Sequence, residues 1–319
     1  MEKPTLMDVK SKSTSSALIL LVALAAIWGS SFILMRVGLS VYTPIQIGCL
    51  RMAFASLVMS PFLIKGFRTV QSYQWKYLLI TGMFGNAIPS ILFPLAQTGI
   101  SSSLAGMINT LTPIFTMILG ATAFGMVVPR SSLLGLFVGF IGALLLIGGG
   151  NGTLHASSPL FPLLVVCATV CYAISVNVLR HKLSGLHPLT ITSFALMFIG
   201  LPMGIYLFTT DFMEKTVNGL AVSSSDTSIR LFPGDGMSMV VTGLIAIFIL
   251  GVLGTALSTV MFNRLIQLSG AIVASSVTYL IPLVATAWGI GFGEHVSWMH
   301  IAGLASVLVG VYLINLRRG

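Results

Sequence analysis

Polar side chains recur in segments of the sequence that are otherwise apolar. Two of these segments, residues 103–125 and 271–293, contain no charged residue and are long enough to cross a hydrocarbon core of about 30 Å. Each places hydroxyl or amide side chains just before a proline, Pro113 or Pro282. Because polar groups that face lipid are costly, we expect these side chains to face the interior of a helix bundle. There they could form hydrogen bonds to a small molecule.

The same reasoning selects candidate substrate-binding residues in the other apolar segments. Hydrogen bonding between helices competes with substrate binding for each of them and contributes about 0.6 kcal/mol on average. The predicted cavity is apolar and aromatic with hydroxyl and amide groups, so we expect neutral, zwitterionic or apolar metabolites. Phosphates, which normally recruit Lys or Arg, are disfavoured. The candidates are Trp28, Ser31, Asn86, Asn109, Thr112, Tyr172, Thr255, Ser258, Ser275, Thr278 and Tyr279.

Four further residues are candidates for gating or coupling. Arg51 is the only charge well inside an apolar segment, where burial costs at least a few kcal/mol. A structural role, with the charge satisfied by backbone carbonyls, a cavity or snorkelling, competes with binding or gating. Glu294 adjoins the end of an apolar segment, where a carboxylate is expected to be solvated more often than coupled to protons. Pro113 and Pro282 remove backbone hydrogen bonds at equivalent points and are candidate hinges.

Several function classes are excluded by composition. Only 7% of the 319 residues are charged and 56% are hydrophobic, which indicates a polytopic membrane protein. The net charge of +9 therefore reflects the distribution of Lys and Arg along the loops, and no nucleic-acid partner is expected. Cys167 and Cys171 share a helix face but have no further ligands, so no metal site is expected. No Ser/His/Asp grouping or glycine-rich phosphate loop occurs, and we expect neither enzyme activity nor a cofactor.

Ten apolar segments must position these residues as membrane-spanning helices. A positive-inside count places twelve Lys and Arg residues on the side of the N-terminus and three on the other side, so we expect both termini in the cytoplasm. The tail 1–16 precedes the first segment, which is expected to be retained, and the polar loop 210–236 is then external. The segments are about 17–36, 43–64, 75–97, 102–124, 131–150, 158–180, 188–209, 237–264, 270–292 and 297–316.

The ten segments read as two copies of a five-helix unit. A shift of 144 residues places Trp28 on Tyr172, and a shift of 169 residues places Pro113 on Pro282. Because five is odd, the second unit must cross the membrane in the opposite sense. The predicted fold is an all-α polytopic membrane protein in which two inverted five-helix repeats, 17–150 and 158–316, surround a central cavity.

These motifs resemble those of the drug/metabolite transporter superfamily, in its ten-helix branch with two EamA-type repeats. The resemblance rests on Trp-Gly-Ser-Ser-Phe at residues 28–32, on Pro44 followed by Arg51, on the two proline-containing helices, and on Gly293 followed by Glu294. It implies a bacterial inner-membrane protein with a cavity between its halves, which exports amino acids or other small metabolites. The first repeat has Gly125 where the second has Glu294.

We therefore expect a secondary transporter that exports small metabolites, above all amino acids, by alternating access. A multidrug or lipophilic-compound exporter and a channel are the alternatives. Small residues on the fifth and tenth segments, including Gly135, Gly142 and Gly310, favour close helix packing within the chain over dimerisation. The expected partners are membrane lipid and a small molecule, with the protein a monomer or a weak homodimer.

Overall fold

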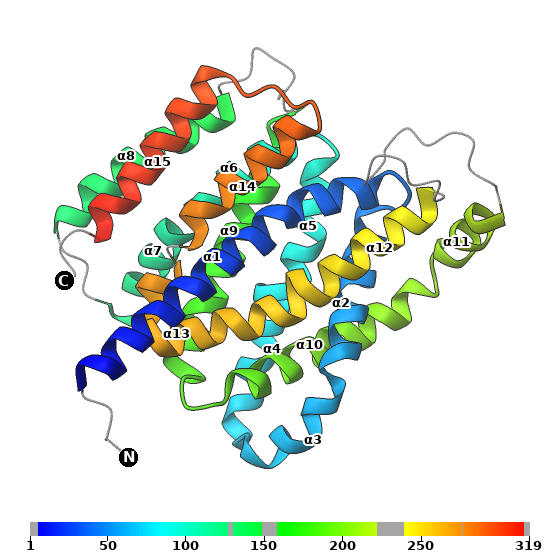
Figure 1. Cartoon of the computed structure of the whole chain (residues 1–319), viewed down its shortest axis with the longest axis horizontal. Helices are drawn as coiled ribbons and strands as arrows, with labels where there is room; N and C mark the ends of the chain where they lie inside the picture. Colours follow the sequence, from blue (N-terminus) through cyan, green and yellow to red (C-terminus); the bar gives the residue numbers. More distant parts are fainter. Residues whose placement is uncertain (1–5, 127–129, 149–157, 222–238, 276, 316–319) are drawn as a thin grey trace.

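Helices joined by short turns make up the described part of the computed structural model, which comprises residues 6–126, 130–148, 158–221, 239–275 and 277–315 (Figure 1). No strand occurs in these ranges. An α-helix satisfies its own backbone hydrogen bonds, which a bilayer requires of any spanning segment. The prediction of an all-helical protein is confirmed for these ranges.

Seven helical stretches in the described ranges are long and apolar enough to cross a membrane, and three apolar helices are shorter. The three shorter helices, Phe137–Leu146, Val277–Gly291 and Trp298–Gly310, lie within the predicted spans 131–150, 270–292 and 297–316. The order of apolar helices therefore agrees with the prediction. The seven longer stretches are Ala17–Leu39, Pro44–Phe62, Ser72–Gln97, Ser102–Phe124, Leu160–Lys182, Pro188–Leu207 and Met239–Leu268.

Capping residues fix the starts of several helices. The Thr43 side chain accepts a hydrogen bond from the backbone N–H of Gln46 at the start of α2, where Pro44 occupies the first turn. Ser101 caps α6 in the same way. In the first half the helices are α1 (Leu6–Leu39), α2 (Pro44–Met59), α3 (Leu63–Gly66), α4 (Trp75–Gly82), α5 (Ile88–Gln97), α6 (Ser102–Ile108), α7 (Thr112–Phe124) and α8 (Arg130–Gly148).

The second half differs from the predicted boundaries in two places. The connection expected at 265–269 is helical, because α13 continues to Ser275 and α14 begins at Val277. Ser269 and Gly270 weaken a helix without ending it, since neither residue lacks a backbone N–H. The helices are α9 (Leu160–Lys182), α10 (Pro188–Leu207), α11 (Phe212–Ala221), α12 (Met239–Gly251), α13 (Ser258–Ser275), α14 (Val277–Gly291) and α15 (Trp298–Asn315).

The second difference is α11, which occupies the first part of the predicted polar loop 210–236. The Lys215 ammonium lies 2.8 Å from Asp211 and holds the pKa of that carboxyl below its usual range. Gln46 donates a hydrogen bond of 2.7 Å to the same carboxylate, which ties this helix to the start of α2. The remainder of the loop, 222–238, lies outside the described residues.

Two π-helical segments interrupt the bundle at related positions. One, η4 (Met83–Ala87), joins α4 to α5, and the other, η6 (Val252–Leu257), joins α12 to α13. A neighbouring backbone lies close to the glycine before each segment. A Cβ added at Gly82 would lie 2.5 Å from the Ala195 carbonyl oxygen, and one added at Gly251 would lie 3.0 Å from that of Arg51. A larger residue would force the helices apart at either glycine.

Helices α8 and α15 pack against each other along one side of the bundle (Figure 1). A Cβ added at Gly142 would lie 2.6 Å from the Val307 amide nitrogen, and one added at Gly310 would lie 2.5 Å from the Gly135 carbonyl oxygen. The small residues on these helices therefore serve packing within the chain, as the sequence predicts.

We expect Gly310→Ala to lower the melting temperature of the purified protein in detergent by several degrees. The added methyl group would overlap the Gly135 carbonyl oxygen, and overpacking of this kind costs about 1–3 kcal/mol. The control is Gly185→Ala, because no atom lies within 4 Å of a Cβ added there. Equal melting temperatures for the two variants would contradict this packing.

Candidate functional site

A cavity of about 140 Å³ lies between the helices at the middle of the bundle. Its wall takes residues from both halves of the chain, and none of the described lining residues comes from α8 or α15. Most of the predicted polar candidates lie in this wall. They are Trp28, Ser31, Asn86, Asn109, Thr112, Tyr172, Thr255 and Thr278, together with Arg51.

Three of the substrate-binding candidates do not line the cavity. Tyr279 is half-buried and packs against the hydrophobic core instead, because consecutive residues of a helix point about 100° apart and Thr278 takes the cavity side. Ser258 is fully buried behind the wall. The side chain of Ser275 lies outside the described residues.

Ser258 positions an aromatic residue of the wall. Its hydroxyl accepts a hydrogen bond of 2.9 Å from Trp28 Nε1 and donates one of 2.7 Å to the Gly254 carbonyl. Trp28 Nε1 also lies 3.2 Å from that carbonyl oxygen. These contacts fix the indole on the cavity side of α1, so the role of Ser258 is to orient Trp28 behind the surface that a ligand would touch.

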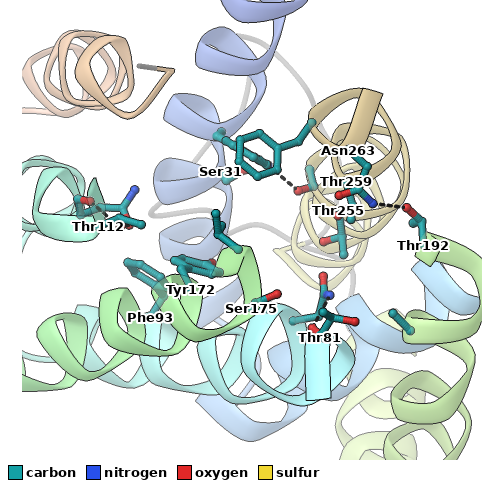
Figure 2. Close-up of a pocket in the computed structure, with 18 of the residues that line it drawn as sticks. Ser31, Thr81, Phe93, Thr112, Tyr172, Ser175, Thr192, Thr255, Thr259 and Asn263 are labelled. Atoms are coloured by element: carbon teal, nitrogen blue, oxygen red, sulfur yellow. Dashed lines mark hydrogen bonds between the residues drawn. The ribbon is translucent and has the colours of Figure 1, made fainter. Parts of the chain in front are cut away.

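The aromatic wall consists of two ring pairs. The Trp28 ring packs on Phe262 at a centroid distance of 5.1 Å, and the Tyr172 ring stacks on Phe93 at 5.9 Å. Figure 2 shows Tyr172 and Phe93 next to each other at the cavity. The expectation that Trp28 and Tyr172 present aromatic faces to one cavity agrees with this geometry.

One polar strip of the wall is predicted only in part, since the sequence analysis names Thr255 but neither Thr259 nor Asn263. Thr255, Thr259 and Asn263 follow one another on the α13 side, and Asn263 donates a hydrogen bond of 3.1 Å to Thr192 on α10 (Figure 2). Asn263 lies at the end of a predicted segment, where a polar residue is unremarkable. The spacing of four residues was the available signal, since it places all three side chains on one helix face. Thr81 and Ser175 also line the cavity and were likewise missed.

Arg51 is 8% exposed and takes its partners from η6. Its Nε donates a hydrogen bond of 2.6 Å to Thr255 Oγ1, and its Nη2 lies 3.5 Å from the Gly254 carbonyl oxygen. The Thr255 hydroxyl donates in turn to the Leu250 carbonyl at 3.1 Å, which leaves its oxygen free to accept from Arg51. Among the described residues that line the cavity, Arg51 is the only charged one, and none is acidic.

Glu294 is not solvated, contrary to the expectation from its place at a helix end. It is 7% exposed and forms an ion pair with Arg36 at the end of α1. Its carboxylate also accepts hydrogen bonds from the Ser102 and Ser103 amides at 2.9 and 3.0 Å, and from the Ser103 hydroxyl at 2.6 Å. The sequence concealed this network because its members are about 190 to 260 residues apart.

The Glu294 network joins three helices at one end of the bundle. It connects the end of α1, the start of α6 and the turn after α14, in which Gly293 has a φ of +81°. A carboxylate at a helix start is stabilised by the exposed N–H groups and by the helix dipole. The network lies outside the cavity wall, as do the buried prolines Pro113 and Pro282, which keep their predicted place in α7 and α14.

The chain matches the EamA-like transporter family twice, over residues 15–148 and 160–316. An uncharacterized transporter of Archaeoglobus fulgidus is 27% identical over 305 residues, which cover 94% of this chain and 99% of the relative. The uncharacterized inner membrane transporter YedA of Escherichia coli K12 is 22% identical over 301 residues, which cover 93% of this chain and 89% of the YedA chain. A Salmonella typhimurium protein named "Probable amino-acid metabolite efflux pump" is 22% identical over 302 residues, which cover 92% of this chain and 93% of that protein.

A solved crystal structure has the same overall fold. It superposes with a TM-score of 0.58 at 15% identity and covers 95% of this chain and 97% of its own. The relatives are named as transporters and seven helical stretches of the described residues are long and apolar enough to cross a membrane, so the chain is a multi-pass membrane protein.

We expect Glu294→Ala to destabilise the purified protein by about 1–3 kcal/mol, because it leaves the Ser102 and Ser103 amides without their acceptor. Glu294→Gln keeps an amide oxygen in place and should cost less. Chemical unfolding monitored by intrinsic fluorescence measures both variants. Glu214→Ala, on the exposed surface of α11, is the control. Equal free energies of unfolding for all three variants and the unmodified protein would show that the network does not contribute to stability.

Proposed function

The chain belongs to the EamA-like transporter family, and from this premise we propose that it is a secondary transporter that exports small metabolites, above all amino acids, by alternating access. The observation that carries the proposal is the cavity at the middle of the bundle, with its aromatic and polar wall drawn from both halves of the chain. Sites at the interface of two repeats are typical of secondary transporters.

The size of the cavity favours small metabolites over drugs. Pockets for drug-sized ligands usually measure about 300–1,000 Å³, and this cavity measures about 140 Å³. Its wall combines ring faces with hydroxyl and amide groups, which suits a small molecule that has both apolar and polar parts. The name of the Salmonella relative supports amino acids as the class of substrate. Export of lipophilic compounds is the alternative and would require a wider cavity.

We propose further that the two family matches form inverted repeats. The shift of 144 residues places Trp28 on Tyr172, and the shift of 169 residues places Phe93 on Phe262. The ring pair Trp28–Phe262 in the structure therefore corresponds to the ring pair Tyr172–Phe93. The same shifts relate η4 to η6. Most lining residues also have a lining partner, such as Ser31 with Ser175, Asn86 with Thr255, and Asn109 with Thr278. A two-fold relation between the halves accounts for all of these pairs.

The departures from this pairing support a transporter held in one of its two states. Five lining residues lack a lining counterpart: Thr81, Ile191, Thr192, Thr259 and Asn263. All five lie on the side of the bundle that holds the α9–α10 connection. Two of their counterparts, Gly48 and Ser90, are packed closely together, since a Cβ added at Gly48 would lie 3.0 Å from the Ser90 carbonyl oxygen. The cavity thus extends toward the α9–α10 end, which the positive-inside count predicts to be cytoplasmic.

We propose that the Glu294 network closes the opposite end, and the sequence contains such a network only once. The repeat counterpart of Glu294 is Gly125, and Arg180, the counterpart of Arg36, lies 3.7 Å from the Met126 sulfur instead of an acidic group. We propose that opening toward the outside breaks the Arg36–Glu294 contact, whereas opening toward the cytoplasm breaks no equivalent ion pair. This asymmetry would favour the inward-open state at rest.

The proposal predicts that Asn109→Ala reduces transport while leaving the amount of folded protein unchanged. Loss of one hydrogen bond to the substrate would raise the half-saturation concentration by about 3- to 10-fold. The assay is counterflow of labelled amino acids in liposomes, with and without a proton gradient. Thr122→Ala is the matched control, because Thr122 lies exposed on α7.

Exchange that saturates and accelerates with substrate on the far side would support a carrier. Flux that never saturates and continues unchanged without substrate on the far side would contradict it and favour a channel. Transport of lipophilic compounds in place of amino acids would favour the alternative substrate class.

A further inference from the structure

We propose that Arg51 binds a carboxylate group of the substrate, so that the transported class is small monocarboxylates, zwitterionic amino acids among them. The inference rests on the proposed transport function and specifies its substrate. It begins from the charge balance of the cavity wall, where Arg51 is the only charged residue among those that the structure describes.

Arg51 lacks a counter-ion among the described residues around it. Its partners are a hydroxyl and a backbone carbonyl, both neutral. Glu294 is the only acidic side chain among the buried described residues, and it is occupied by Arg36 and the start of α6. A buried cation without an anion is strongly unfavourable. A bound anion would remove much of this cost, which gives the cavity a preference for a negatively charged group.

The geometry of the guanidinium also suits a carboxylate. The Thr255 hydroxyl accepts the hydrogen bond from Arg51 Nε, and its own hydrogen bond to the Leu250 carbonyl fixes its orientation. Nη1 has no hydrogen bond to the described protein, and the 3.5 Å contact of Nη2 with Gly254 is long. The edge formed by Nη1 and Nη2 therefore remains for two parallel hydrogen bonds, the arrangement in which Arg recognises carboxylates.

The rest of the wall suits the other end of an amino acid. Trp28, Phe93 and Tyr172 present ring faces, which attract an ammonium group, and Asn86 and Asn109 provide amide oxygens. The described part of the wall contains one Arg and no Lys, so it matches one negative charge better than the two charges of a phosphate ester. A zwitterion with a small side chain satisfies both ends without adding net charge to the cavity.

The test compares matched probes that differ only at the carboxylate: alanine, leucine and phenylalanine, each with its amide and its decarboxylated amine. Counterflow in liposomes gives half-saturation concentrations for the unmodified protein and for Arg51→Gln. We expect the amide and the amine to be at least about 10-fold poorer substrates than the amino acid. Arg51→Gln should raise the half-saturation concentration of the amino acid by about 10- to 100-fold, the range for a charge-assisted hydrogen bond, without worsening that of the amide.

A thermal-shift measurement separates binding from a purely structural role. Without ligand, we expect Arg51→Gln to melt at or above the temperature of the unmodified protein, because it removes an uncompensated charge. Millimolar amino acid should raise the melting temperature of the unmodified protein but not that of Arg51→Gln. Arg51→Lys keeps the positive charge but cannot donate the two parallel hydrogen bonds of the guanidinium. Compared with Arg51→Gln, it should recover part of the preference for the amino acid over its amide. Thr255→Val should weaken amino-acid binding while retaining the preference over the amide.

The proposal is overturned if the unmodified protein handles amino acid and amide equally, a result that needs no variant. Unchanged half-saturation in Arg51→Gln would also overturn it. Failure of the transport function has a different signature, namely no flux of any probe in the unmodified protein. In that case a thermal shift by amino acids that depends on Arg51 still supports the carboxylate site, and the absence of such a shift rejects it.

Discussion

A polar or charged group inside a membrane protein must find its partner within the protein, because lipid offers none. The described parts of this chain follow that constraint at each point of interest. Arg51 is held by a hydroxyl and a carbonyl of η6, Trp28 by Ser258, and Glu294 by Arg36 and the start of α6. Every one of these contacts joins segments that are far apart in the sequence. The same contacts therefore assemble the bundle and hold the residues of the cavity wall and of the Glu294 network in place.

The π-helical segments and the glycines before them connect packing to the cavity. A π segment shifts the hydrogen-bonding pattern of the helix and is frequent at functional sites. In η6 it places Thr255 and the Gly254 carbonyl within reach of Arg51 and Trp28. Gly251 allows the backbone of α2 to approach closely enough for the Arg51 side chain to reach that segment. Helix packing at this point thus sets the position of Arg51, the only charged side chain among the described residues of the cavity wall.

Much of the fold and part of the site follow from the sequence. Long apolar segments predict helices, and polar residues such as Asn109 and Thr278 predict an interior wall, because the cost of exposing them to lipid is general. The sequence does not predict the environment of Glu294, which depends on how three helix ends meet. It also assigns Tyr279 to the wall, because the residue types alone do not show which of two consecutive polar residues, Thr278 or Tyr279, faces the cavity. Asn263 shows the opposite error: its place near a segment end conceals a position that lines the cavity.

The central claim is that the cavity communicates with one side of the membrane at a time, and that the Glu294 network closes the outer side. The most direct measurement is modification of a Ser31→Cys variant, with Cys49, Cys167 and Cys171 replaced by Ser, by an impermeant thiol reagent added to either side. The account predicts reaction from the side of the α9–α10 connection and protection from the other side. It also predicts that added Glu294→Ala exposes the cysteine to the outer side. Reaction from both sides at once in the presence of intact Glu294, accompanied by passive flux, would contradict it.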